Sequence, residues 1–138
     1  AAEHSDGILA RAYWHARHGD DAAAEADYRT VLAMEGTRAS PNDLLVASRT
    51  YMQFLLSRGR IADASRQLDQ LEANAPGVVE RDYDGALTTL RVRLAEGDAQ
   101  RTQAAARRVL ALIGEREPPA DLREVLESAA AVPSAPPG

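Results

Sequence analysis

The chain has 138 residues, enough for one ordinary domain, with 28 alanines and 16 arginines but no lysine and no cysteine. The absence of cysteine excludes a disulfide framework, a thiolate nucleophile and zinc-finger or iron–sulfur ligands, and the absence of lysine excludes Schiff-base chemistry and a P-loop lysine. The net charge is −5 and the basic residues are spread along the chain, so we expect no nucleic-acid surface.

Alanine and arginine form helices readily, whereas β-branched residues are scarce and aromatic residues make up only 4% of the chain. This composition predicts an all-α fold. The longest apolar runs, such as 44–47 and 54–56, cover a few residues, so we expect a soluble protein that does not insert into a membrane. The chain has no signal peptide and starts at Ala1 rather than Met, so we expect a piece of a longer or processed protein, in a cytoplasmic or periplasmic compartment that the sequence leaves open.

Three glycines divide the chain into repeats. Gly19, Gly59 and Gly97 lie 40 and 38 residues apart, and each is followed 17 residues later by a helix breaker, namely Gly36, Pro76 and Gly114. Five, nine and twelve positions after each glycine stand apolar or small residues, a spacing that places them on one helical face. They are Ala24, Tyr28 and Val31, then Ala64, Leu68 and Leu71, then Thr102, Ala106 and Val109.

A second helical pattern precedes each of the three glycines. It comprises Ile8, Leu9, Ala12, Tyr13 and Ala16 in the first repeat, follows Pro41 in the second, and comprises Tyr83, Leu87, Leu90 and Leu94 in the third. Because short turns join antiparallel neighbours, we predict three helix pairs over about residues 7–36, 41–76 and 82–114. Residues 1–6 are expected to be frayed.

After the third pair, one amphipathic helix is predicted over residues 119–130, with Leu122, Val125, Leu126 and Ala129 on its apolar face. Such a helix fits a cap that covers the end of a repeat stack. The proline-rich tail 131–138 is predicted to be disordered. The whole is therefore expected to be a single domain over 7–130 with about seven helices.

The second helices resemble those of the tetratricopeptide repeats, whose unit has a glycine near its turn, then alanine and an aromatic residue four positions apart, then proline. Ala24 and Tyr28 with Gly36, and Ala64 and Leu68 with Pro76, stand at the family spacing, and Thr102, Ala106 and Gly114 form a degenerate copy. The first helices match poorly, and the repeats are longer than the family's 34 residues. The resemblance, over about residues 6–114, implies an α-solenoid, a right-handed superhelical stack of antiparallel helix pairs.

In proteins of this family the first helices line a concave surface that binds peptides or protein segments. The corresponding candidates are polar or amphipathic residues of the first helices outside the core stripe: Tyr13, Arg17, Arg49, Gln53 and Arg91. Tyrosine and arginine often anchor interfaces, and arginines can bind the carboxylates of an acidic peptide. The alternative is that the three arginines are simply solvated. The family's carboxylate clamp needs lysines that this chain lacks, so we do not expect clamp function.

Other chemistry has little support. His15 and His18 lie one turn apart and could share a metal, but their spacing is not that of the usual helical zinc signature, and a helix C-terminus favours histidines in any case, so we expect no metal site. Trp14 is expected to pack against the neighbouring repeat. No serine has the G-x-S-x-G setting of a hydrolase, and the carboxylates fall on helical stretches expected to be exposed. We therefore expect no cofactor and no enzymatic activity.

Two functions remain open. One is a non-catalytic module that binds a protein or peptide segment, acidic or otherwise, in its groove, within a larger chain or scaffold such as a bacterial secretion or export assembly, the scaffold resting on family analogy alone. The other is a structural spacer or self-association element of a longer repeat array, whose apolar ends stack on other repeats.

Overall fold

The computed structural model describes residues 5–38 and 41–131. The helices follow in the order α1 (Ser5–Arg17), α2 (Asp21–Arg38), α3 (Pro41–Ser57), α4 (Ile61–Asn74), α5 (Val78–Arg81), α6 (Tyr83–Glu96), α7 (Ala99–Ile113), a 3-10 turn (Ala120–Leu122) and α8 (Arg123–Ala131). No strand occurs in these ranges, so the predicted all-α fold class is confirmed.

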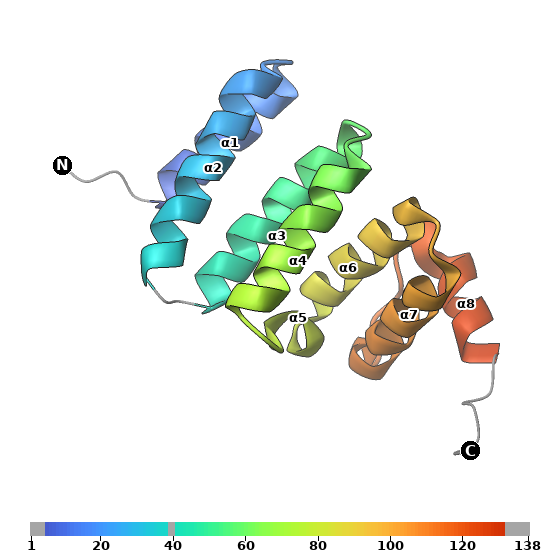
Figure 1. Ribbon diagram of the computed structural model, residues 1–138. Helices are drawn as coiled ribbons and strands as arrows, with labels where there is room; N and C mark the ends of the chain where they lie inside the picture. The colour runs from blue at the N-terminus through green and yellow to red at the C-terminus, as the bar shows by residue number, and fades with distance from the viewer. Residues whose placement is uncertain (1–4, 39–40, 132–138) are drawn as a thin grey trace. The chain divides into compact units, whose positions relative to one another are not determined.

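Contacts between backbone positions divide the chain into two compact units, residues 1–78 and 79–138, which are called here the N-terminal and C-terminal units. In the N-terminal unit α1 packs on α2, α2 on α3 and α3 on α4, and in the C-terminal unit α6 packs on α7 and α7 on α8 (Figure 1). This packing of consecutive antiparallel pairs is the kind used by helical-repeat proteins. The single domain predicted over 7–130 spans the division and stays a prediction.

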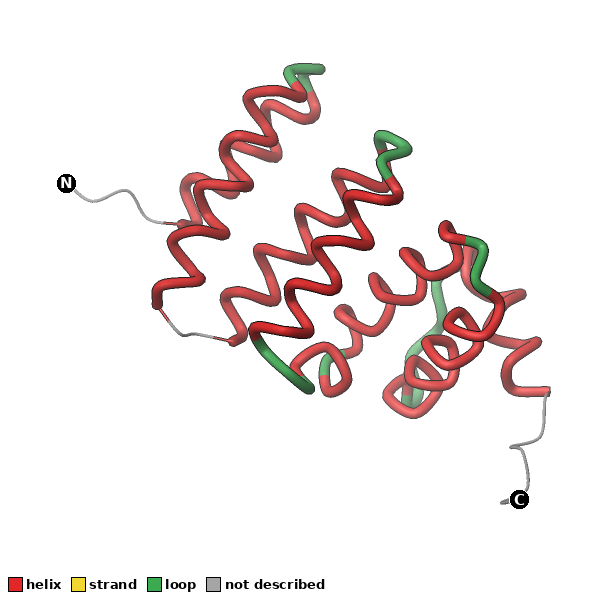
Figure 2. The backbone as a smooth tube through the Cα atoms, in the orientation of Figure 1, coloured by secondary structure: helices red, strands yellow, loops and turns green. Residues whose placement is uncertain are grey.

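The repeated glycines form the turns within the pairs, which are short (Figure 2). Gly19, Gly59 and Gly97 have φ angles of 78°, 72° and 78°, a left-handed conformation that glycine adopts without strain. In the first two turns the residue after the glycine donates its backbone N–H to a carbonyl five positions back, at 2.9 Å from Asp20 to His15 and from Arg60 to Leu55. These bonds close the preceding helix and reverse the chain within a few residues.

The core positions predicted from the repeat are confirmed. All nine residues found five, nine and twelve places after the three glycines are buried, with exposed fractions between 0% and 7%. In the N-terminal unit, Tyr28 of α2 packs against Tyr51 of α3. The two rings are stacked, with a distance of 5.3 Å between their centroids. Burial of one face per helix is the main stabilising term for elements of this length.

In the C-terminal unit, α8 covers the α6–α7 pair as the sequence predicts for a cap. The buried cluster includes Leu90 of α6, Val109 of α7 and Leu126 of α8. Both helices of the pair begin at an aspartate whose carboxylate accepts a backbone N–H, Asp82 from Gly85 at 2.7 Å and Asp98 from Arg101 at 3.1 Å. These side chains satisfy N–H groups that the first turn of a helix leaves without partners.

Several predicted boundaries are wrong. Ser5 and Asp6, predicted to be frayed, belong to α1, while residues 1–4 and 132–138 lie outside the described residues. Gly36, predicted to end the second helix, lies inside α2, which ends at Arg38. A single glycine is tolerated within a helix at a cost of about 1 kcal/mol. The short helix α5 was not predicted, and Ala131, assigned to the tail, is the last residue of α8.

We expect Gly7→Ala and Gly59→Ala to change stability in opposite directions. A Cβ atom would meet nothing within 4 Å at either position, so sterics do not separate them. Gly7 lies in α1, where alanine should add about 0.5 to 1 kcal/mol, whereas Gly59 has a left-handed φ of 72°, where alanine should cost about 1 to 2 kcal/mol. Urea denaturation followed by circular dichroism measures both, and two changes of the same sign would contradict the assigned turn geometry.

Candidate functional site

A groove lies between α1 and α3 in the N-terminal unit. It encloses about 320 Å³, and it is called here the α1–α3 groove. Its lining comprises Tyr13, Ala16, Arg17, Tyr28, Thr50, Gln53, Phe54, Ser57 and Arg58. The two helices belong to different pairs, so the groove exists only when the pairs pack together.

The inner wall of the α1–α3 groove is aromatic. Tyr28 and Phe54 are only 2% and 5% exposed, and their rings lie 5.4 Å apart at an angle of 40°. Burial raises the pKa of the Tyr28 hydroxyl above its ordinary value. By contrast, Tyr13 at the rim keeps 55% of its surface exposed. A cavity with an aromatic inner wall and a polar rim is suited to bind an amphipathic group.

Arg58 positions the two sides of the groove. Its Nε donates to Asp21 at 3.0 Å, and its Nη2 donates to the carbonyl of Ala16 at 2.7 Å. The third branch, Nη1, donates to Ser57, and the guanidinium lies over the ring of Phe54 at 5.0 Å. Since Arg58 leaves the end of α3 and reaches the end of α1 and the start of α2, it fixes the width of this end of the groove.

Arg17 is the one groove arginine without an acidic partner among the residues that the structure describes. Its Nη1 donates to the Tyr13 hydroxyl at 3.3 Å, and its guanidinium lies 5.5 Å from the centre of the same ring. Both contacts are to a neutral group on its own helix. Most donors of the Arg17 guanidinium therefore remain open toward solvent and the groove.

A cluster of charged and hydroxyl groups joins the two helix pairs beside the groove; it consists of Glu25, Arg29, Tyr51, Arg60 and Asp63 and is called here the Glu25 cluster. Arg60 binds both carboxylate oxygens of Glu25, with Nη1 at 2.7 Å and Nη2 at 2.9 Å. The Tyr51 hydroxyl donates to Glu25 at 2.7 Å, and Arg29 donates to it at 3.0 Å. Glu25 thus accepts bonds from α2, α3 and the residue that precedes α4.

The hydrogen bonds from Arg60 lower the pKa of Glu25 from its ordinary value to about 2, even though burial acts in the opposite direction. Arg60 also lowers the pKa of Asp63. Burial, followed by the hydrogen bond to Glu25, raises the pKa of Tyr51. Glu25 is therefore charged, and Tyr51 neutral and able to donate, throughout the physiological pH range.

Three of the five predicted groove residues come together. Tyr13 and Arg17 from α1 and Gln53 from α3 line the α1–α3 groove. Arg49, on α3, is half-buried and does not line it. Arg91 lies in the C-terminal unit, where its Nε and Nη2 each lie 3.2 Å from an oxygen of Asp121 and lower the pKa of that carboxyl. Arg91 therefore belongs to a different unit and already has a carboxylate partner.

Trp14 does not take the expected position, and His15 and His18 make separate contacts. Trp14 is 56% exposed rather than packed against a neighbouring repeat, and its ring stacks on His18 at 4.0 Å. His15 instead places its Nε2 3.9 Å from Asp27, which Arg11 binds through both oxygens. Within the described ranges, no group of three or more histidine, aspartate or glutamate side chains is placed to hold a metal ion.

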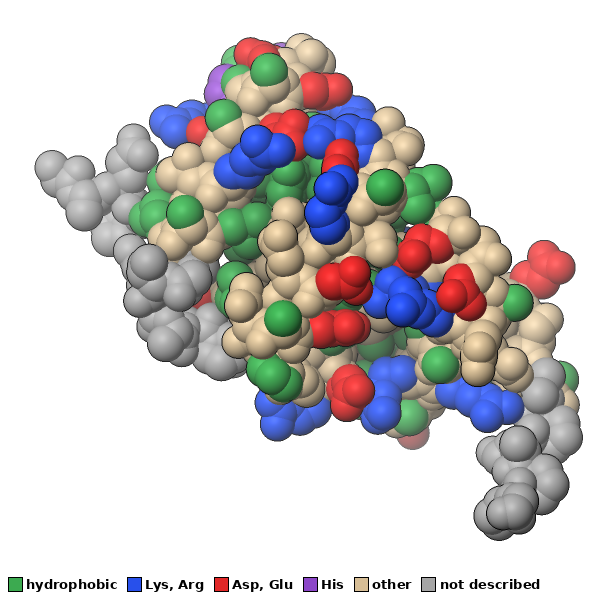
Figure 3. Space-filling view, in the orientation of Figure 1, with side chains coloured by type: hydrophobic (Ala, Val, Ile, Leu, Met, Phe, Trp, Pro, Cys, Tyr) green, Lys and Arg blue, Asp and Glu red, His purple; other side chains and the backbone are tan. Residues whose placement is uncertain are grey.

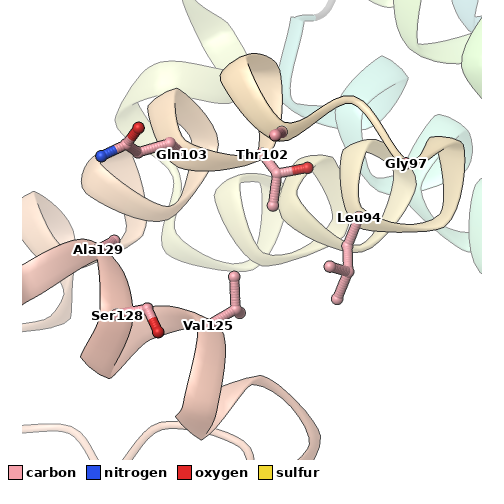
Figure 4. A pocket seen from close by; sticks show the side chains of 8 residues that line it. Leu94, Gly97, Thr102, Gln103, Val125, Ser128 and Ala129 are labelled. Carbon is pink, nitrogen blue, oxygen red and sulfur yellow. The ribbon is translucent and has the colours of Figure 1, made fainter.

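A second cavity, of about 440 Å³, lies in the C-terminal unit between the α6–α7 turn and α8 (Figure 4). Its lining is uncharged: Leu94, Gly97, Ala99, Thr102, Gln103, Val125, Ser128 and Ala129. Leu94, which the sequence predicts to lie on the apolar stripe of its helix, is 44% exposed. The cavity offers no ionised group to orient a ligand, which distinguishes it from the α1–α3 groove.

Sequence reasoning missed the Glu25 cluster, although the sequence carries a signal for it. Arg60 follows Gly59 at the position where the other two repeats have Asp20 and Asp98. Both aspartates cap the next helix through backbone N–H groups, at 3.2 and 3.1 Å, whereas Arg60 makes no such side-chain bond. Arginine cannot accept a hydrogen bond from the helix N-terminus, so its presence at this capping position indicates that Arg60 has a role in tertiary contacts. The sequence does not identify Glu25 as its partner.

We expect Glu25→Gln to flatten the acid dependence of stability. Glu25 has a folded pKa of about 2 against an ordinary 4.5, so the stability it supplies is complete above the unfolded value and is lost as the pH falls toward 2. This lowering of the Glu25 pKa corresponds to roughly 3 kcal/mol in the free energy of unfolding at neutral pH. Urea denaturation at a series of pH values should show that the free energy of unfolding falls more steeply with decreasing pH in the wild type than in the variant.

The matched control for this experiment is Glu72→Gln, which removes the same charge from an exposed position on α4 of the same unit. Its stability curve should run parallel to that of the wild type. Parallel curves for the wild type and Glu25→Gln would show that the Glu25 cluster does not hold the two pairs together.

The charged side chains on the face shown in Figure 3 are interleaved by sign rather than gathered into one basic or acidic patch. Among the described helices, none is both long and apolar enough to cross a bilayer. A scan of family models found no match to this chain. Searches of curated proteins and of solved structures likewise found no match.

Proposed function

We propose that the chain is a non-catalytic module that binds a segment of a partner protein in the α1–α3 groove. The observation that carries the proposal is the convergence of Tyr13, Arg17 and Gln53 around one cavity, although they come from two helix pairs. The cavity combines a buried aromatic wall with an exposed tyrosine and an arginine that has no carboxylate partner among the described residues. These are the residue types that contribute most energy to protein interfaces.

The repeated turns and core positions support kinship with the tetratricopeptide repeats, and we propose that the groove corresponds to the surface on which that family binds its partners. Membership of a larger scaffold, such as a secretion or export assembly, is part of the same proposal and rests on the family resemblance. Arg58 in the groove lining and Glu25 on α2 are both engaged in contacts between helices, which supports a binding role over a catalytic one.

A second candidate is a spacer or self-association element, and the exposure of Trp14 favours it. An indole that is 56% exposed on the first helix, stacked only on His18 and edge-on to His15, is an apolar surface that another repeat or a second copy could cover. Light scattering over a range of concentrations separates the two functions. Self-association that Trp14→Ser abolishes would favour the spacer, whereas a groove module should remain monomeric.

The binding proposal predicts that Arg17→Glu prevents the enrichment of peptides from a displayed library of random sequences, whereas the wild type enriches them. Reversal of this charge should lower the affinity for the enriched peptides by more than tenfold, because a charge-assisted hydrogen bond contributes about 1.5 to 3 kcal/mol. The matched control is Arg108→Glu, which makes the same charge change at an exposed position on α7.

Circular dichroism should show equal helix content in the wild type and both variants. Because a glutamate at the end of α1 is unfavourable for the helix dipole, the milder Arg17→Gln is measured alongside. If both Arg17 variants retain the enriched peptides with wild-type affinity, the α1–α3 groove is not the binding site.

A further inference from the structure

The face of α3 that lines the α1–α3 groove continues beyond the cavity. Thr50, Gln53 and Ser57 line the cavity, and Val46 lies on the same helical face, four residues before Thr50 and seven before Gln53. Val46 is 41% exposed, an unusual state for a large apolar residue of this chain. Val46 lies outside the lining of the α1–α3 groove, so it offers an apolar contact to a segment that extends past the groove along α3, about 10 Å from Gln53.

Charged side chains of both signs lie along this surface. The turns after α1 and α3 lie at the same end of the N-terminal unit (Figure 2), and Arg17 and Arg58 lie at that end. The first turns of the same helices carry the acidic side chains of Asp6 and Asp43, both exposed. The turn end also carries Asp20 and Asp21, so the net charge does not distinguish the two ends. A bound segment receives its direction from the positions of Arg17 at the turn end and Val46 toward the first turn of α3.

Arg17 and Arg58 are not equivalent. Arg58 is neutralised by Asp21, with Nη2 at 2.9 Å from its carboxylate, and two further donors are used by Ala16 and Ser57. Arg17 contacts only the Tyr13 hydroxyl and ring, so among the described residues it is the groove arginine without a carboxylate partner. A planar guanidinium with open donors matches a carboxylate through two parallel hydrogen bonds.

We propose that the occupant is a protein segment that places a carboxylate on Arg17, an adjacent aromatic or aliphatic side chain against the wall of Tyr28 and Phe54, and a second apolar side chain on Val46. The distance of about 10 Å corresponds to about three residues of an extended chain. This inference rests on the proposed function and adds the chemistry and spacing of the partner. The carboxylate is that of an aspartate or glutamate side chain within the segment.

The test uses synthetic peptides and the full chain, with binding followed by NMR through the side-chain signals of Arg17 and Gln53. The first peptide is blocked at both ends and contains an aspartate, a phenylalanine next to it and a leucine three positions further on; a second has the reversed order. A third replaces the aspartate by asparagine. A fourth ends in phenylalanine with a free carboxylate, and a fifth is its amide.

The aspartate peptide in the preferred direction should bind roughly tenfold to a hundredfold more tightly than its asparagine counterpart. Arg17→Gln should abolish this difference while leaving the affinity of the asparagine peptide unchanged, as expected when the two groups interact directly. Val46→Ser, a substitution at an exposed position, should lower the affinity for the peptide that contains leucine. It should not change the affinity for a peptide in which glycine replaces that leucine. If the peptide with the free terminal carboxylate binds more tightly than its amide and than the aspartate peptide, the assignment to a side-chain carboxylate is overturned.

The outcomes separate this inference from the proposed function. Equal affinity for the aspartate and asparagine peptides, with shifts at Gln53 in both, would overturn the carboxylate inference and leave the binding function standing. Tight binding that is insensitive to both Arg17→Gln and Val46→Ser would overturn it as well. Peptides that shift no groove signal at any concentration would overturn the inference and count against the proposed function together.

Discussion

The N-terminal unit depends on the bidentate contact between Glu25 and Arg60. Arg60 leaves the turn between α3 and α4, and Glu25 lies on α2, so the contact ties the second helix pair to the first. Its side chains are 18% and 35% exposed, a setting in which removing one partner leaves the other charge poorly solvated. Tyr51 places a further hydrogen bond on the same carboxylate from α3. These bonds fix the positions of the pairs that together form the α1–α3 groove.

Small side chains make this arrangement possible. Ala12, Ala24, Ala64 and Ala106 are completely buried, one in each of α1, α2, α4 and α7. Alanine allows helix axes to approach closely, because the distance between packed helices is set by the side chains at the contact. The high alanine content is therefore partly a packing requirement. The few aromatic rings are concentrated where Tyr28, Tyr51 and Phe54 fill the space between the two pairs.

The same packing explains why the groove is open and preorganised. Tyr28 and Phe54 are held by the core on one side and form the groove wall on the other, while Arg58 bridges the ends of α1 and α3. A partner segment therefore meets side chains that are already ordered, which lowers the entropy cost of binding. Arg17 and Tyr13 remain exposed because they lie past the core stripe, at the end of their helix.

The sequence by itself determined the helices, the three glycine turns and the buried positions five, nine and twelve residues after them, because these follow from local geometry and helical periodicity. It also named Tyr13, Arg17 and Gln53, but it grouped them with Arg91, which the tertiary structure places in the other unit beside Asp121. Only the packed structure revealed the partnership of Glu25 with Arg60 and the exposure of Trp14. Such contacts join residues far apart in the chain, and their choice depends on how whole helices dock, which no local pattern encodes.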